Sequence, residues 1–300
     1  MKHITKTLSK VPSYLIETIE KESIPYLEQV RVKEYSKRLP PLEGQRVAVI
    51  PWSGGLDSTT SLIMAIEAGI SIRTIFLNYG QPYIKKELLA TNKLEKLIRA
   101  KYPEADWTEH YIVDVSFIDQ LVKSKFNGEW GHIFPMRNFL ILEESAAIAQ
   151  PNRYTEVWFS SVQGEMPYSG GDKSVVFLTY MKEIFGKRNI NLTTPLVGLT
   201  KADMVQWAIA QLDRFRIIRH TISCFNGEGD SHCGECQACF NRAVAFFAAN
   251  QLPLSGVPYH KNALRNFGEN YIRKLAKESY YSPTRRSQLQ QFINFISQQT

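Results

Sequence analysis

The sequence predicts an α/β fold with a doubly wound parallel β-sheet, because strand-like and helix-like segments alternate through the middle of the chain. Short runs rich in valine and isoleucine are followed by longer stretches in which apolar residues recur every three or four positions. Strands connected in this way lie parallel, with helices on both faces of the sheet and binding residues at the carboxyl ends of the strands. The predicted strands cover residues 47–52, 72–77, 109–115 and 156–161, and the predicted helices cover residues 58–68, 84–100 and 136–149.

Length and composition agree with a folded, globular protein. The 300 residues are 44% hydrophobic, which is enough for one large core or a core with a small satellite. The N-terminal residues contain no apolar block of the signal-peptide kind, and no run of 18 apolar residues occurs, so we expect a cytoplasmic location and no membrane partner. The net charge of +7 suits an anionic ligand such as a nucleotide, or nucleic acid, although a solvated basic surface is the commoner cause.

A glycine-rich motif, Ser53-Gly54-Gly55-Leu56-Asp57-Ser58, lies between the first predicted strand and the helix after it. Adjacent glycines permit positive φ angles and leave room for backbone N–H groups to surround an anion at a helix N-terminus. The Walker loop, GxxxxGK[ST], would supply a lysine to the phosphates, and this spacing is absent here. We therefore expect a phosphate-binding loop without that lysine; an ordinary glycine turn is the alternative.

Three later loops carry polar residues at the ends of predicted elements. Tyr79-Gly80-Gln81 follows the second strand, where it either contacts a base or sugar or forms an ordinary turn. Arg137 and Asn138 fall in the first turn of the helix over residues 136–149, and an arginine there indicates an anionic partner because it opposes the helix dipole; an ordinary surface arginine is the alternative. Thr200 and Asp203 form a capping-box pattern at the start of another helix, with Lys201 as a phosphate contact.

All four cysteines lie close together, in a C-x8-C-x2-C-x2-C pattern. Four thiolates at this spacing suit a tetrahedral structural zinc, and a cytoplasmic chain would not keep them as disulfides. A redox pair or an iron–sulfur cluster would be the alternatives, although no further cysteine remains to act as a resolving thiol or sulfur carrier. The predicted zinc ligands are Cys224, Cys233, Cys236 and Cys239.

The motif SGGLDS resembles the SGGxDS loop of the PP-loop ATP pyrophosphatases, and the complete set of motifs is similar to the 7-cyano-7-deazaguanine synthases of the QueC family. The similarity runs from about residue 47 to residue 246. It implies adenylation of 7-carboxy-7-deazaguanine by ATP, release of AMP and pyrophosphate, and attack by ammonia to give an amide and then a nitrile. It also implies magnesium, structural zinc and a homodimer.

The resemblance also implies roles for individual residues. The expected catalytic residues, which hold the pyrophosphate or stabilise its charge, are Ser53, Asp57, Ser58, Arg137 and Lys201. Asp57 would cap the turn or orient magnesium. The ATP-binding residues are Trp52, Ser53, Gly54, Gly55, Leu56, Asp57, Ser58, Thr59, Tyr79, Gly80, Gln81, Arg137 and Asn138. The substrate-binding residues are Tyr168, Ser169, Gly170, Asp172 and Lys173.

Several motifs depart from the family's usual pattern. Residues 79–83 read YGQPY where the family has YGQRH, and residues 135–138 read PMRN where the family has PGRN. The substrate loop usually reads DYSGYPDCR, whereas residues 167–174 read PYSGGDKS, without the first aspartate and the Cys-Arg pair. ATP activation should therefore be retained while the acceptor pocket is altered.

Three further functions remain open. Divergent QueC-like enzymes occur in antiphage defence, where the deazapurine is joined to a protein or another amine. A tRNA-thiolating PP-loop enzyme would explain the basic charge, but it would need a catalytic cysteine or cluster in addition to the zinc ligands. A non-catalytic zinc module that binds nucleic acid would leave SGGLDS without a role.

The motifs divide the chain into four expected regions. Residues 1–42 form an N-terminal helical extension, residues 43–222 the ATP-binding α/β domain, residues 223–250 a zinc knuckle with its docking helix, and residues 251–300 a helical C-terminal extension. We expect the two extensions to distinguish this chain from an ordinary synthase.

Overall fold

The computed structural model describes residues 46–118, 136–163, 172–226, 229, 231–257 and 282–298. The helical patterns expected within residues 1–42 lie outside this part of the chain. Within it, no helix is long and apolar enough to cross a membrane.

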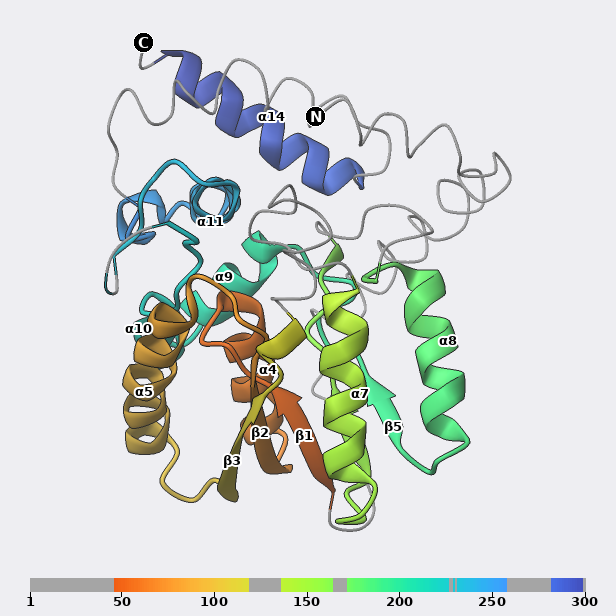
Figure 1. Cartoon of the computed structure of the whole chain (residues 1–300). Coiled ribbons are helices and arrows are strands. Elements are labelled where there is room, and N and C mark those ends of the chain that lie inside the picture. Colours follow the sequence, from red (N-terminus) through yellow and green to blue (C-terminus); the bar gives the residue numbers. More distant parts are fainter. Residues whose placement is uncertain are drawn as a thin grey trace, which may run out of the picture.

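A five-stranded parallel sheet forms the centre of the molecule, in the strand order β3-β2-β1-β4-β5 (Figure 1). The strands are β1 (Val47–Pro51), β2 (Ser71–Asn78), β3 (Trp107–Asp114), β4 (Glu156–Trp158) and β5 (Asn191–Thr193). This confirms the predicted α/β class. The predicted fourth strand is too long, because pairing with β1 and β5 ends at Trp158, and the three-residue β5 gave no recognisable sequence pattern.

Helices connect the strands and continue beyond the sheet. They are α4 (Leu56–Glu67), α5 (Ile84–Lys101), α7 (Arg137–Ala149), α8 (Val175–Gly186), α9 (Lys201–Ile209), α10 (Leu212–Ile218), α11 (Gln237–Ala248) and α14 (Pro283–Gln298), with a 3-10 helix, η3, at Leu252–Leu254. The first helix begins at Leu56, two residues before the predicted start, because the turn at Gly55 already directs the chain into it.

Successive side chains of β1 point to opposite faces of the sheet, and the helices that pack against them show which helices cover each face. Ala48 and Ile50 pack in one core cluster with residues of α4, α5, α9, α10 and α11, whereas Val49 packs in a second cluster with α7 and α8. Figure 1 shows α7 and α8 on one side of the sheet and α5, α9 and α10 on the other. On α4, Leu62 is fully buried and Ile66 partly buried against the first cluster, as their spacing predicts.

The topology places a binding crevice at the carboxyl end of β1. This strand pairs with β2 on one side and with β4 on the other, so the connections leave β1 and β4 in opposite directions. At such a switch point the connecting loops separate and leave room for a ligand. Trp52, directly after β1, is 1% exposed and packs edge-on against Trp107 at 5.1 Å, which anchors the beginning of the glycine-rich loop.

Candidate functional site

The glycine-rich loop makes a compact turn between β1 and α4. Gly54 has a φ of 73°, and a Cβ atom there would lie 3.0 Å from the Cβ of Ala90 and 3.1 Å from the backbone nitrogen of Thr91. A side chain would therefore meet both backbone strain and the wall of α5. The hydroxyls of Ser53 and Ser58 lie 3.5 Å apart across the turn. The loop thus presents two hydroxyls and the N-terminus of a twelve-residue helix to the crevice.

Asp57 and Lys201 form an ion pair at the edge of this loop. The Lys201 ammonium lies 2.6 Å from each carboxylate oxygen of Asp57. Gly55 is the N-cap of α4 and Asp57 lies in the first turn of this helix, so the role of Asp57 in capping the turn or orienting magnesium stays a prediction. Lys201 begins α9, whose capping box between Thr200 and Asp203 is confirmed, and it thereby brings a cation to the loop.

A pocket of about 180 Å³ opens beside the loop at the ends of β1 and β2. It is lined by Pro51, Trp52, Ser53, Gly55, Asp57, Ser58, Ile75, Phe76, Leu77, Tyr79, Gln81, Glu87, Arg137, Asn138, Ile141, Phe159, Ser160 and Lys173. The Nε atom of Arg137 and the hydroxyl of Ser160 are buried without a hydrogen-bond partner among the described residues. Buried polar atoms of this kind are costly unless a ligand or water satisfies them, so the pocket suits a polar, anionic ligand.

Arg137 enters the pocket from the first turn of α7. One of its terminal nitrogens lies 3.5 Å from the Tyr79 hydroxyl, which is 2.8 Å from the Tyr83 hydroxyl. Burial raises the pKa of both tyrosines, so each hydroxyl stays neutral beside the guanidinium. The backbone N–H of Asn138 donates to the Asp172 carboxylate at 2.8 Å, which connects α7 to the segment before α8. Asp172 therefore has a structural contact in addition to its expected role in substrate binding.

Glu87 forms the back of the pocket together with Gln81. The Gln81 amide donates to Glu87 at 2.9 Å and to the Leu77 carbonyl at 3.1 Å, and it accepts from the Tyr79 N–H at 3.0 Å. Burial raises the pKa of Glu87 to about 7, although Gln81 and the nearby Arg137 oppose this shift. Gln81 thus holds the turn and the carboxyl group together, and Gly80 supports the same turn with a φ of 83°.

Because the raised pKa of Glu87 belongs to the folded state, this carboxyl stabilises the protein at low pH and less so as pH rises through 7. We expect Glu87→Gln to remove this dependence. Between pH 5 and 8.5 the free energy of unfolding of the wild type should fall by about 1–3 kcal/mol relative to the variant. Urea unfolding of both proteins at the two pH values measures the difference. Glu95→Gln, in an exposed pair with Arg99 on the same helix, is the matched control; parallel curves for wild type and Glu87→Gln would contradict the shift.

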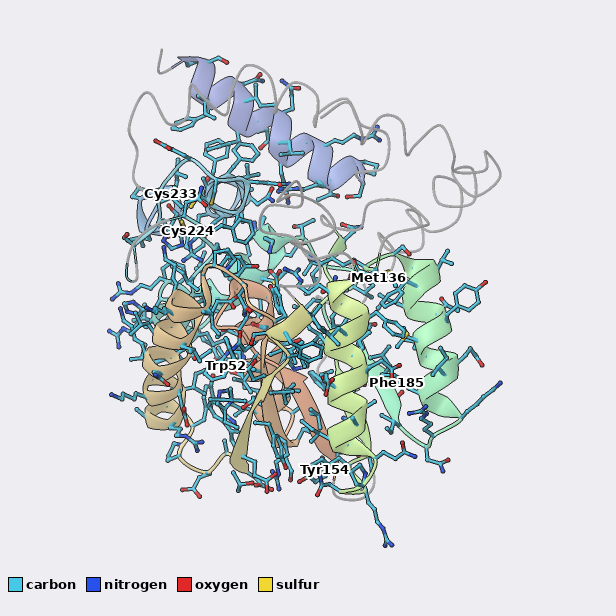
Figure 2. The ribbon with its side chains drawn as sticks, viewed as in Figure 1. Trp52, Met136, Tyr154, Phe185, Cys224 and Cys233 are labelled. Carbon is cyan, nitrogen blue, oxygen red and sulfur yellow. The ribbon has the colours of Figure 1, made fainter. Side chains whose placement is uncertain are left out.

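Met136 carries backbone strain at the entrance to α7, where the related motif has glycine. Its φ is 57°, in the left-handed region, and its side chain is 53% exposed (Figure 2). We expect Met136→Gly to raise the free energy of unfolding by about 0.5–1 kcal/mol, because glycine adopts this conformation without the steric penalty. Asn189→Gly, at a residue with a φ of 58°, is the control with a smaller expected effect, because asparagine tolerates this region. Thermal unfolding that ranks the two variants in the opposite order would contradict this account.

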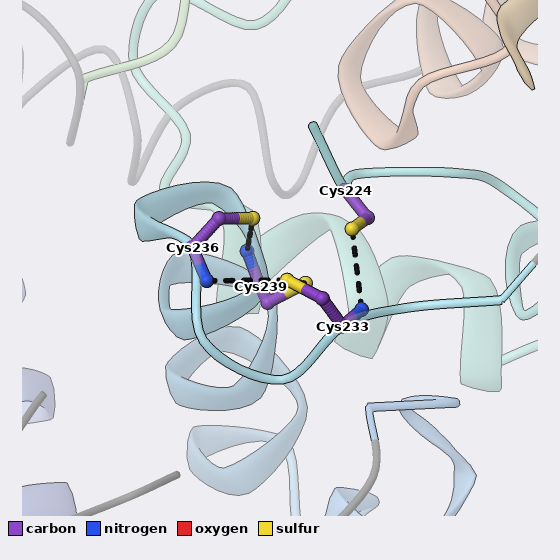
Figure 3. A group of neighbouring side chains, drawn as sticks. All are labelled: Cys224, Cys233, Cys236 and Cys239. Carbon is purple, nitrogen blue, oxygen red and sulfur yellow. Dashed lines mark hydrogen bonds between the residues drawn. The ribbon is translucent and has the colours of Figure 1, made fainter. Parts of the chain in front are cut away.

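The four cysteines converge between the end of α10 and the start of α11 (Figure 3). Their sulfur atoms all lie within 4.8 Å of one another, and those of Cys233 and Cys239 are 3.9 Å apart. A tetrahedral zinc with bonds of about 2.3 Å separates its sulfurs by about 3.8 Å, so a small contraction would complete the site. The described cluster therefore fits the predicted metal site.

The surroundings of the cluster favour thiolates once a cation is present. Backbone N–H groups point at three of the sulfurs, and Cys236 is the N-cap of α11, where it accepts from the Cys239 N–H. Hydrogen bonds with neighbouring thiols and burial raise the pKa of Cys239. A divalent cation would reverse this effect, because it stabilises the deprotonated sulfur. His232, adjacent to the cluster, instead accepts a backbone hydrogen bond from Ser223.

The cysteine cluster is tied to the glycine-rich loop. The backbone N–H of Ile222 donates to the Gly54 carbonyl at 3.0 Å, and Cys224 packs in one apolar cluster with Ala90 and Ile222. On the other side, the fully buried Arg242 donates to the Arg219 and Ser255 carbonyls and to the Thr221 hydroxyl. The metal site is thus part of the wall that supports the loop.

The structure brings most predicted site residues to one place. Ser53, Asp57, Ser58, Tyr79, Gln81, Arg137, Asn138 and Lys173 line the pocket, and Lys201 reaches it through Asp57. Leu56 and Thr59 lie in the core instead, where Thr59 accepts a hydrogen bond from the Trp52 indole. The predicted substrate residues Tyr168, Ser169 and Gly170 lie outside the described residues.

Sequence reasoning missed Tyr83, Glu87 and Ser160 as residues of the site or its immediate support. Glu87 lies six residues after Gln81, one turn into a helix, and a charged residue in a first turn is a common sequence feature. Its distinguishing property is burial, which the local pattern did not indicate. Ser160 lies two residues after the end of β4, so a search for polar residues near every strand end could have found it.

Comparison with known proteins agrees with these features. The family model described as queuosine biosynthesis protein QueC matches residues 47–250. A 7-cyano-7-deazaguanine synthase from Nautilia profundicola is 30% identical over 220 residues, covering 66% of this chain and 92% of that protein. The enzyme of the same name from Methanocaldococcus jannaschii is 25% identical over 233 residues, covering 67% of this chain and 95% of that protein.

Solved structures show more distant similarity. A U34-tRNA thiolase, NcsA, from Methanococcus maripaludis has a TM-score of 0.43 at 13% identity, covering 92% of this chain and 81% of that one. An NMN synthetase from Francisella tularensis has a TM-score of 0.40 at 15% identity, covering 82% of this chain and 91% of that one. These similarities are too weak to assign an activity. The family match extends from β1 to the end of α11 and includes both the glycine-rich loop and the four cysteines, and on this basis the chain belongs to the QueC family.

Proposed function

We propose that this protein is an ATP-dependent ligase that adenylates the carboxylate of 7-carboxy-7-deazaguanine. The observation that carries this proposal is the pocket at the end of β1, where a glycine-rich loop, the Asp57–Lys201 pair and the incompletely bonded Arg137 surround one space. In the reaction, a substrate carboxylate oxygen attacks the α-phosphorus of ATP and the bond to the β-phosphate oxygen breaks. Pyrophosphate leaves, and an acyl adenylate remains.

Different residues would bind the two ends of the triphosphate during this reaction. Ser53, Ser58 and the N-terminus of α4 would bind the leaving pyrophosphate, because hydroxyls and helix N–H groups favour anions. Arg137 would stabilise charge that develops nearer the α-phosphate. When bound, magnesium would neutralise phosphate charge, and Asp57 is the loop carboxylate that would hold it. Both Asp57 oxygens contact Lys201, so magnesium would share this carboxylate with the lysine ammonium.

The second half of the reaction transfers the acyl group to an amine. The amine nitrogen forms a bond to the carbonyl carbon, the bond to AMP breaks, and the amine loses a proton to give an amide. With ammonia, a second activation by ATP would convert the amide oxygen into a leaving group and yield the nitrile. Zinc would have only a structural role in both halves, because four cysteine ligands leave no open position for a substrate.

A larger amine, such as one on a partner protein, is a second candidate acceptor. Lys173 lines the pocket in the segment that lacks the family's Cys-Arg pair, and a lysine ammonium cannot replace the bidentate contacts of an arginine. Met136 also places an exposed side chain beside Arg137, where the related motif has none. On this reading the adenylate forms normally but is discharged slowly to ammonia.

A tRNA-thiolating activity is less well supported. The chain has four cysteines, and all of them belong to the one cluster. No cysteine therefore remains to carry sulfur if the cluster holds zinc.

Mass spectrometry of the products from 7-carboxy-7-deazaguanine, ATP and ammonia tests the proposal. AMP, pyrophosphate and an amide or nitrile of the deazaguanine are the expected products, with free nitrile a minor one if the acceptor is larger. ADP and phosphate as the nucleotide products would contradict adenylation. Rapid, stoichiometric formation of 7-cyano-7-deazaguanine would instead show that the altered motifs leave ordinary synthase activity intact.

A further inference from the structure

Helix α14 lies outside the region that matches the family and yet contacts Thr200, the residue directly before Lys201. The family match ends at residue 250, whereas α14 spans Pro283–Gln298 and lies across α11 (Figure 1). Its apolar residues Leu289, Phe292 and Ile296 pack against Phe240, Ala243 and Val244 of α11. This contact holds the C-terminal half of α14 in place, and it leaves the N-terminal half over the start of α9.

In that N-terminal half, Gln288 binds the residue that caps α9. Its amide nitrogen donates to the Thr200 hydroxyl at 3.1 Å. The same hydroxyl donates to the Asp203 carboxylate at 2.9 Å and accepts from the Asp203 N–H at 3.3 Å. A hydroxyl can donate once and accept twice, so Gln288 completes the hydrogen bonding of a fully buried Thr200.

Thr200 stands directly before the lysine of the candidate site. Lys201 is the first residue of α9, and its ammonium contacts both oxygens of Asp57 at 2.6 Å. A short covalent and hydrogen-bonded path therefore leads from Gln288 through Thr200 to the ion pair. Removing the donor would leave a lone pair of a buried hydroxyl unsatisfied and would weaken the cap that orients the first turn of α9.

A second polar contact meets the same place. The Ser282 hydroxyl, next to the start of α14, donates to the Gln163 side chain at 3.2 Å. The backbone N–H of Gln163 donates in turn to the carbonyl of Leu199, the neighbour of Thr200, at 3.1 Å. The C-terminal segment therefore reaches Thr200 directly through Gln288 and its neighbour Leu199 indirectly through Gln163.

We propose that α14 is a positioning element of the active site, in which Gln288 acts through Thr200 to hold Lys201 against Asp57. The role assigned to Lys201 in ATP chemistry rests on the proposed function, whereas the contact itself does not. Gln288 is therefore a positioning residue and not a catalytic one. The contact between Gln288 and Thr200 involves a helix that lies beyond the end of the family match at residue 250. It is therefore an addition to the part of the chain that matches the family.

Full-length Gln288→Leu tests the proposal with two measurements. The kcat for AMP formation should fall about tenfold, while the KM for ATP stays within about twofold, because a displaced lysine affects the reacting state more than the bound ground state. Acylation of Lys201 by an amine-reactive ester, followed by peptide mass spectrometry, should be faster in the variant because its ion pair is loosened. Gln290→Leu is the matched control: it lies on the exposed face of α14 and binds Asn294, and it should leave both measurements unchanged.

A double-mutant cycle separates positioning from general stability. In a Thr200→Val background, Gln288→Leu should cause no further loss of kcat and no further increase in Lys201 acylation, because the shared hydroxyl is already gone. Equal effects of Gln288→Leu in both backgrounds, or wild-type acylation of Lys201 in folded Gln288→Leu, would overturn the proposal. A wild-type protein that forms no AMP would contradict the proposed function alone, since the acylation measurement still decides the role of α14.

Discussion

Replacement of Cys236 by serine is expected to remove the metal and to lower the free energy of unfolding by several kcal/mol, because binding of a structural zinc contributes directly to folding. Serine is well suited to this test. Cys236 is both a proposed metal ligand and the N-cap of α11, and serine is itself a favourable N-cap. The helix start is thus preserved in Cys236→Ser, so the loss of stability reports the missing metal ligand.

The effect should extend to the glycine-rich loop. Ile222, two residues before Cys224, donates to the Gly54 carbonyl, so loosening the cluster would weaken a support of the glycine-rich turn. Elemental analysis should find one zinc per wild-type chain and less than one-tenth of that in the variant, with weaker ATP binding by calorimetry. Iron with a visible absorbance band, or an unchanged melting temperature without metal, would contradict the zinc assignment.

Replacement of Asp57 by alanine should reduce kcat by about 10²- to 10³-fold while the protein remains folded. The carboxylate holds Lys201 at 2.6 Å beside the loop, and it is the group proposed to hold magnesium, so its removal disturbs two charges that act on the phosphates. The two side chains are only 20% and 15% accessible, so Asp57→Ala takes this carboxylate away from a largely buried ammonium and should also lower the free energy of unfolding. Steady-state release of AMP measures the loss.

Asp57→Asn is the matched control, because it keeps the shape of the side chain and removes its charge. It should be nearly as inactive as Asp57→Ala if the charge is what matters. Activity close to wild type in Asp57→Asn would show that the side chain has a steric role. A circular-dichroism melt of both variants should confirm that the activity loss is not caused by unfolding.

The parallel sheet and the glycine-rich loop were predictable from sequence because their signals are local. The apolar run of β1 indicates a buried strand directly, and SGGLDS combines a glycine turn and a helix start in six neighbouring residues. The cysteines were equally clear, since their side-chain chemistry and spacing leave few structural interpretations. The capping box at Thr200 was likewise found from residue types at fixed offsets.

Long-range partners were not predictable in the same way. Asp57 was expected to cap the turn or to orient magnesium, whereas its ion pair with a lysine 144 positions later in the chain was not expected. The burial that shifts the pKa of Glu87, and the contact of Gln288 with Thr200, likewise depend on how separate helices pack. Short elements such as β5 were also not predicted, because three residues give too little pattern to distinguish a strand from a loop.

Pyrophosphate exchange measures the central claim most directly, since reversible adenylation must return labelled pyrophosphate to ATP. With the purified full-length protein, magnesium and 7-carboxy-7-deazaguanine, label should enter ATP without any added amine, and Asp57→Ala should abolish the exchange. Exchange that is absent with this carboxylate, while the protein is folded and contains its metal, would contradict the assignment of this pocket as an adenylation site.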